Sequence, residues 1–94
     1  MATKIEVRKS GESAYDVRVT EGKSESSHHV TLGAADYERL AAGKVTQEEF
    51  IRRSFEFLLE RESKESILAR FDLTVISRYF PQYEREIKKR IAAA

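Results

Sequence analysis

The chain has no cysteine among its 94 residues, no tryptophan, one proline and four glycines. The absence of cysteine excludes disulfide bonds, thiolate catalysis and cysteine-ligated metal sites, and it fits a reducing compartment. No stretch approaches the roughly 20 consecutive apolar residues that cross a bilayer. The N-terminal residues alternate charged and apolar instead of forming the apolar run of a signal peptide. We therefore expect a cytoplasmic protein that does not associate with membranes.

The chain also lacks an excess of charge of either sign. It has 17 basic and 16 acidic side chains, which gives a net charge of +1 and no overall attraction to nucleic acid or an anionic membrane. What it does have is enough apolar material to fold: 40% of the residues are hydrophobic and nine are Phe or Tyr. A chain of this length is expected to form a single compact domain, residues 1–94, with a small core.

The N-terminal third has the two-residue period of strands. Apolar side chains alternate with polar ones around Ile5 and Val7, again from Tyr15 to Val19, and a weaker pattern follows to Leu32. Turn-forming clusters at residues 10–13 and 21–23 separate these runs. The pattern predicts a three-stranded antiparallel meander, within about residues 4–32, that is covered on one face.

A helix start signal follows. Thr46 is placed to cap a helix, Glu49 is placed to reach back to the Thr46 amide, and Val45 and Phe50 occupy the positions of a hydrophobic staple. The helix is expected to run to about Arg61. Its apolar residues span an arc of roughly 200°, so we expect the central helix of the protein, in contact with the sheet and with other helices.

Other helices are predicted on both sides of this one. Residues 34–42 form a short helix that Gly43 ends, and Ser63 is a candidate cap for a helix that includes Phe71. A last helix begins near Pro81, with an apolar stripe at helical spacing: Phe80, Tyr83, Ile87 and Ile91. The fold class expected is α+β, a three-stranded antiparallel meander followed by three to four helices, between about residues 34 and 91, packed on one face.

The run from Ser66 to Phe80 has some features of a helix-turn-helix, with Ala69 in a first helix and Arg78 in a second. The turn lacks a glycine, the spacing between the helices is short, and Pro81 stops the second helix early. The run is therefore a weak basis for reading DNA.

Catalytic and metal-binding patterns are also lacking. The pair His28-His29 is expected to face opposite sides of a strand, so the two rings of one chain cannot easily chelate one metal ion, and only a dimer that brings two copies together leaves such a site open. Glu60, Glu62 and Glu65 are interleaved with Arg61 and Lys64, which is typical of a solvated junction. The glycines match no phosphate-binding loop. The sequence predicts no catalytic residue, no metal and no cofactor, and a protein that is not an enzyme.

The remaining hypothesis is a small non-enzymatic protein-interaction or regulatory module, with a protein partner or self-association as a homodimer. The alternative is a nucleic-acid-binding regulator that uses the basic C-terminal third, because residues 63–94 hold seven basic and four acidic side chains. The candidate partner-binding surface is Tyr15, Arg78, Tyr79, Tyr83 and Lys88.

Overall fold

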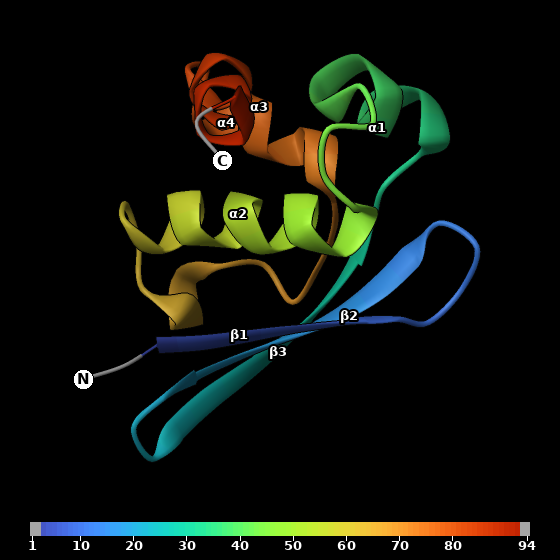
Figure 1. Ribbon diagram of the computed structural model, residues 1–94. Helices are drawn as coiled ribbons and strands as arrows, with labels where there is room; N and C mark the ends of the chain where they lie inside the picture. The colour runs from blue at the N-terminus through green and yellow to red at the C-terminus, as the bar shows by residue number, and fades with distance from the viewer. Residues whose placement is uncertain (1–2, 93–94) are drawn as a thin grey trace.

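The computed structural model describes residues 3–92 as an α+β protein with three layers. A sheet forms the first layer, the long helix α2 (Gln47–Leu59) lies over it, and the helices α1 (Ala34–Ala41) and α4 (Tyr83–Ala92) lie beyond α2 (Figure 1). The helices cover one face of the sheet and leave the other face open. The ends of the predicted domain, residues 1–2 and 93–94, lie outside the described residues.

The predicted meander is confirmed. Strands β1 (Thr3–Lys9), β2 (Ala14–Glu21) and β3 (Ser24–Thr31) pair antiparallel in sequence order. A two-residue turn joins β2 to β3, and Gly22 adopts a positive φ of 61° there, which a glycine does without strain. The register places the apolar residues of β2 on the side that the helices cover.

The sheet has a fourth strand that the sequence analysis missed. Strand β4 (Arg70–Asp72) pairs parallel to the end of β3, so the strand order is β1-β2-β3-β4 and the sheet is mixed. The helix expected to include Phe71 is absent from the described residues. A 3₁₀ turn η1 (Lys64–Ser66) and an extended segment take its place, because the peptide groups near residue 69 bond to β3: the His29 N–H donates to the Ala69 carbonyl at 2.7 Å.

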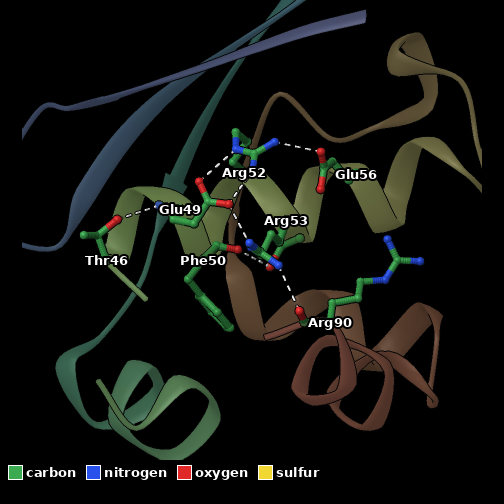
Figure 2. Close-up of polar contacts among 8 residues, drawn as sticks. Thr46, Glu49, Phe50, Arg52, Arg53, Glu56 and Arg90 are labelled. Carbon is green, nitrogen blue, oxygen red and sulfur yellow. Dashed lines mark hydrogen bonds and ion pairs between the residues drawn. The ribbon is translucent and has the colours of Figure 1, made fainter. Parts of the chain in front are cut away.

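Of the two hydrogen bonds predicted between Thr46 and Glu49 at the start of α2, one is present. The Thr46 hydroxyl accepts a hydrogen bond from the Glu49 N–H at 3.0 Å. The reciprocal bond is replaced by ion pairs, because the Glu49 carboxylate is held by Arg52 and by Arg53, the latter at 2.7 Å (Figure 2). Glu49 and Arg53 form an i,i+4 ion pair, and Arg52 joins Glu49 to Glu56.

Helix α2 is central, as its wide apolar arc predicted. Phe55 points to the sheet, where its ring lies 5.4 Å from the His28 ring. Phe57 points to the outer helices, with its ring 5.3 Å from that of Tyr83. Both phenylalanines are fully buried, so one helix supplies the core on two sides.

Of the first and last helices, the first differs in one detail from the prediction. Helix α1 ends on two successive residues of positive φ, Ala42 at 50° and Gly43 at 72°, so the reversal begins one residue before the glycine. The stripe of the last helix is confirmed: Tyr83, Ile87 and Ile91 are buried and Phe80 is partly buried against the same core.

The possible helix-turn-helix of residues 66–80 is not formed. The described chain there consists of β4, a 3₁₀ turn η2 (Leu73–Val75) and the four-residue helix α3 (Ile76–Tyr79). A first helix is missing and the second is about one turn long. This segment therefore has no helix that could lie in a DNA groove.

Candidate functional site

An apolar groove lies between the C-terminal end of α2 and the segment that runs from η1 to α3. It encloses about 150 Å³. Its walls are mainly apolar, and the lining residues that matter below are Leu58, Glu62, Leu68, Phe71, Tyr79 and Phe80. The groove exists because residues 67–72 do not coil into a helix: residues 70–72 pair with β3 as β4, which leaves a gap between that segment and α3.

The rim of the groove carries the two large apolar side chains recorded as exposed within residues 3–92. Leu68 is 46% exposed and Tyr79 is 65% exposed. Leu68 points outward because the carbonyl of the same residue bonds inward, to His28 Nδ1 at 2.8 Å. Tyr79 is the last residue of α3. Two exposed apolar groups on one rim form a surface that water solvates poorly.

The groove also has one charged wall. Glu62 is half-buried and lines it. No ion pair involving Glu62 is recorded within the described chain, whereas its neighbour Glu60 is paired with Arg90 at 2.6 Å. The hydrogen bond from Arg90 lowers the pKa of Glu60. The third glutamate of this region, Glu65, is paired with Lys64, whose side chain is buried. The region is therefore only in part the solvated junction expected from the sequence.

The five predicted surface residues do not gather at one place. Arg78 and Tyr79 are exposed on α3, and Lys88 is exposed on α4. Tyr15 is fully buried, with its hydroxyl donating to Gln47. Tyr83 is fully buried too.

The burial of Tyr83 has an internal explanation. Its hydroxyl and the Ser54 hydroxyl are 2.7 Å apart, and the Ser54 hydroxyl donates to the Phe50 carbonyl at 2.9 Å. Burial raises the pKa of the Tyr83 phenol. Tyr15 and Tyr83 therefore cannot form part of a partner-binding surface in this structure. The sequence analysis did not identify Leu68 as a surface residue, because it expected a helix through Phe71. The exposure of Leu68 is evident only once this segment is known not to be helical.

The histidine pair faces opposite sides of β3, as expected from the strand alternation. His28 is 4% exposed: Nδ1 is bonded to the Leu68 carbonyl and Nε2 lies 2.8 Å from the Ser26 hydroxyl. A serine and an imidazole at this distance can act as nucleophile and base, but the reaction also needs an accessible cleft and oxyanion donors. With the ring buried and both nitrogens engaged, the structural role is the better account of His28: it fixes residue 68 to the sheet.

The open face of the sheet is polar and mixed in charge. A shallow hollow of about 490 Å³ there is lined by both signs, including Arg8, Asp16, Arg18, His29 and Arg70. The carboxylate of Asp16 is bonded to His29 Nδ1 at 2.9 Å. Within the described part of the chain, no group of three or more His, Asp or Glu side chains is close enough together to hold a metal ion.

Fold and surface define a small α+β protein with an apolar groove at the β4 edge of its sheet. Comparison with protein families, with curated proteins and with solved structures found no match to this chain. Among residues 3–92, no helix combines the length and the apolar character needed to cross a bilayer.

Proposed function

We propose that this chain is a non-enzymatic protein-interaction module that binds a short apolar segment of a partner protein in the groove beside α3. The observation that carries the proposal is that Leu68 and Tyr79, the large apolar side chains recorded as exposed, stand on the rim of the same groove. Large exposed apolar groups that lie together mark binding sites more often than groups that are scattered.

The size of the groove limits what it takes. A space of about 150 Å³ is of the order that holds one benzene-sized group. The groove therefore fits a single Leu, Met or Phe side chain, with Leu68 and Tyr79 closing over the residues on either side. Tyrosine suits this position because its ring gives a large contact area and its hydroxyl remains solvated.

The charge of the groove limits the partner further. Glu62 supplies a carboxylate at one wall, so a Lys or Arg next to the inserted side chain completes an ion pair that the apolar contact partly desolvates. The partner we propose is a peptide segment with one large apolar residue beside a basic one.

A selection of displayed 12-residue peptides on the immobilised chain tests this proposal. The expected result is enrichment of peptides with a large apolar residue next to Lys or Arg. Their binding is expected to weaken at least tenfold in Leu68→Glu and in Tyr79→Ser, and to persist in Glu38→Gln, a matched exposed substitution on α1. Equal binding by all four proteins, or no enriched peptide, contradicts the proposal.

The second candidate is nucleic-acid binding, favoured by the exposed Arg78 beside the exposed Tyr79, because an aromatic ring and a guanidinium can stack on bases. Lys88 adds a further exposed cation on α4. Titration with a labelled single-stranded RNA distinguishes the two candidates. RNA binding falls steeply between about 50 and 200 mM salt, and Arg78→Ala and Lys88→Ala weaken it. Peptide binding in an apolar groove changes little over this range.

A further inference from the structure

The edge of the sheet farthest from the groove is strand β1, and its outer side has no partner strand within the described chain (Figure 1). The hydrogen bond from the Ser10 N–H to the Ala14 carbonyl sets the phase of the β1–β2 ladder. Because antiparallel pairing alternates, the even-numbered residues of β1 direct their peptide groups to β2. Thr3, Ile5, Val7 and Lys9 direct theirs outward.

The side chains of β1 divide in the same way. The odd-numbered residues Ile5 and Val7 face the helical layer and are only half-buried, as is Leu59 of α2 above them. A hollow of about 430 Å³ adjoins Ile5 and Leu59, and its other lining residues are Thr3, Glu56, Glu60 and Arg90. The even-numbered residues Lys4, Glu6 and Arg8 face the open side of the sheet. The edge therefore combines free peptide groups with an incompletely covered apolar strip.

Proteins protect such edges with proline, bulges, inward-facing charges or a row of lysines. From Thr3 to Val7 this strand has no proline and no bulge, and its inward side chains are uncharged. The charged side chains on the open face of the sheet alternate in sign, Lys4 then Glu6. A row of lysines repels a second copy of itself, but an alternating row does not.

We propose that β1 pairs antiparallel with β1 of a second copy of this chain, with Ile5 on the two-fold axis. In this register, Ile5 faces Ile5 of the second copy and Val7 faces Thr3. Each Lys4 faces Glu6 of the other chain, so the two-fold symmetry forms two attractive charge pairs. The odd-numbered residues, whose peptide groups are free, are those that the register hydrogen-bonds.

The charge pattern selects this register over its neighbour. A two-fold axis at Val7 also pairs opposite charges, Glu6 with Arg8, but it places Ile5 opposite Lys9, a charged side chain against an apolar one. The axis at Ile5 avoids this conflict and covers the hollow beside Leu59. The inference shares with the proposed function the premise that this is a binding protein. It uses the opposite edge of the sheet, so the two proposals can fail separately.

Charge swaps test the interface in solution. In sedimentation velocity from about 1 to 200 µM, the wild-type chain is expected to dimerise. Lys4→Glu and Glu6→Lys each create two like-charge pairs, and each is expected to raise the dissociation constant about tenfold or more. Lys4 faces Thr20 within one chain, so Lys4→Glu changes no cross-strand charge pair of the monomer. Circular dichroism of each variant checks that it is folded.

Mixing the two variants gives the decisive result. A Lys4→Glu chain and a Glu6→Lys chain are complementary to each other in the proposed register, so the mixture is expected to form a heterodimer more tightly than either variant forms a homodimer. The double variant is expected to return to within about threefold of the wild-type dissociation constant.

A monomeric wild type at 200 µM, or folded variants that do not form a heterodimer, overturns the proposal. A Lys4→Glu chain that dimerises as tightly as the wild type excludes the Ile5 register. Leu68→Glu leaves dimerisation unchanged, which separates this surface from the groove.

Discussion

Residues 14–59 and residues 60–80 are stabilised in different ways. The first stretch consists of two long strands and two helices, whose backbone groups bond to one another within regular ladders and turns. The second has two 3₁₀ turns, a three-residue strand and a four-residue helix. It is tied to the sheet by the short pairing of β4 with β3 and by individual side-chain hydrogen bonds, among them His28 Nδ1 to the Leu68 carbonyl and the Thr31 hydroxyl to the Asp72 carboxylate at 2.7 Å.

The difference is relevant to function. A regular element loses little when one bond is removed, because its neighbours share the constraint. The irregular segment depends on a three-residue pairing with β3 and on a few side chains of β3, and it is this segment that forms the groove and exposes Leu68. The shape of the proposed binding surface therefore depends on residues of β3, which contact the segment from the side that faces away from the partner.

The largest loss of stability is expected from a substitution at Phe57, where the two regions meet. Phe57 belongs to α2, but its ring lies 5.9 Å from that of Phe80, and the Arg61 guanidinium lies 3.8 Å from its centre. Phe57→Ala is expected to lower the free energy of unfolding by about 3–5 kcal/mol, because a fully buried ring leaves a cavity. Urea denaturation should show both regions unfolding together. Separate transitions in circular dichroism and in tyrosine fluorescence would contradict this expectation.

A smaller and local effect is expected from His28→Leu. The variant keeps a side chain of similar size but leaves the Leu68 carbonyl without its donor, at a cost of about 1–3 kcal/mol. Hydrogen exchange is expected to speed up at residues 67–72 and to stay unchanged in the β1–β2 ladder. His29→Gln is the matched control, since the neighbouring ring is only half-buried and bonds to Asp16, and it should change stability by less than about 0.5 kcal/mol.

In the regular region, the helix cap gives an effect of intermediate size. Thr46→Ala removes the acceptor of the Glu49 N–H and is expected to cost about 1 kcal/mol. Thr46→Ser keeps the hydroxyl and should lie close to the wild type. The measurement is the free energy of unfolding from urea denaturation. A Thr46→Ala variant as stable as the wild type would show that the ion pairs of Glu49 hold the helix start without the cap.

The smallest loss of stability is expected from protonation of the Asp72 carboxylate at low pH. Burial opposes ionisation of this carboxylate, but hydrogen bonds from Thr74 and Thr31 outweigh burial and lower the pKa of Asp72 below its ordinary value of 3.8. A lowered pKa contributes stability above the ordinary value, and that contribution is lost as the pH falls through the lowered one. The wild type should therefore be more stable than Asp72→Asn at pH 7, and the difference should narrow by about pH 3. A constant difference would contradict this account.

The regular region could be predicted from the sequence because its signals are local. The alternation around Val17 and the stripe that ends at Ile91 each repeat within a few residues, and the Thr46 cap needs only the next turn. Strand β4 gives no comparable signal, because three residues are too few to show a period. Its position depends on bonds to residues about 40 positions away along the chain, such as His28 to Leu68.

The candidate site was predicted only in part, for two physical reasons. Phe71 and Leu68 have helical spacing, but tertiary bonds override it: Phe71 lies beside Phe55, with the rings 6.1 Å apart, and Leu68 turns outward. Tyr15 and Tyr83 were expected at the surface, but each hydroxyl has an internal partner, Gln47 and Ser54, which allows the whole side chain to be buried. Partners that distant in sequence cannot be inferred from composition.

The parallel pairing of β3 with β4 has a consequence for the order of folding. A parallel strand cannot be reached by a tight turn, and here both α1 and α2 lie between the two strands in sequence. The antiparallel hairpins close short loops, whereas β4 closes a long one, so we expect it to form late, after α2 has docked on the sheet. Contacts made after the rate-limiting step slow unfolding without speeding folding. Loss of the His28 hydrogen bonds is then expected to raise the unfolding rate, which shortens the lifetime of the folded state, and to leave the folding rate almost unchanged.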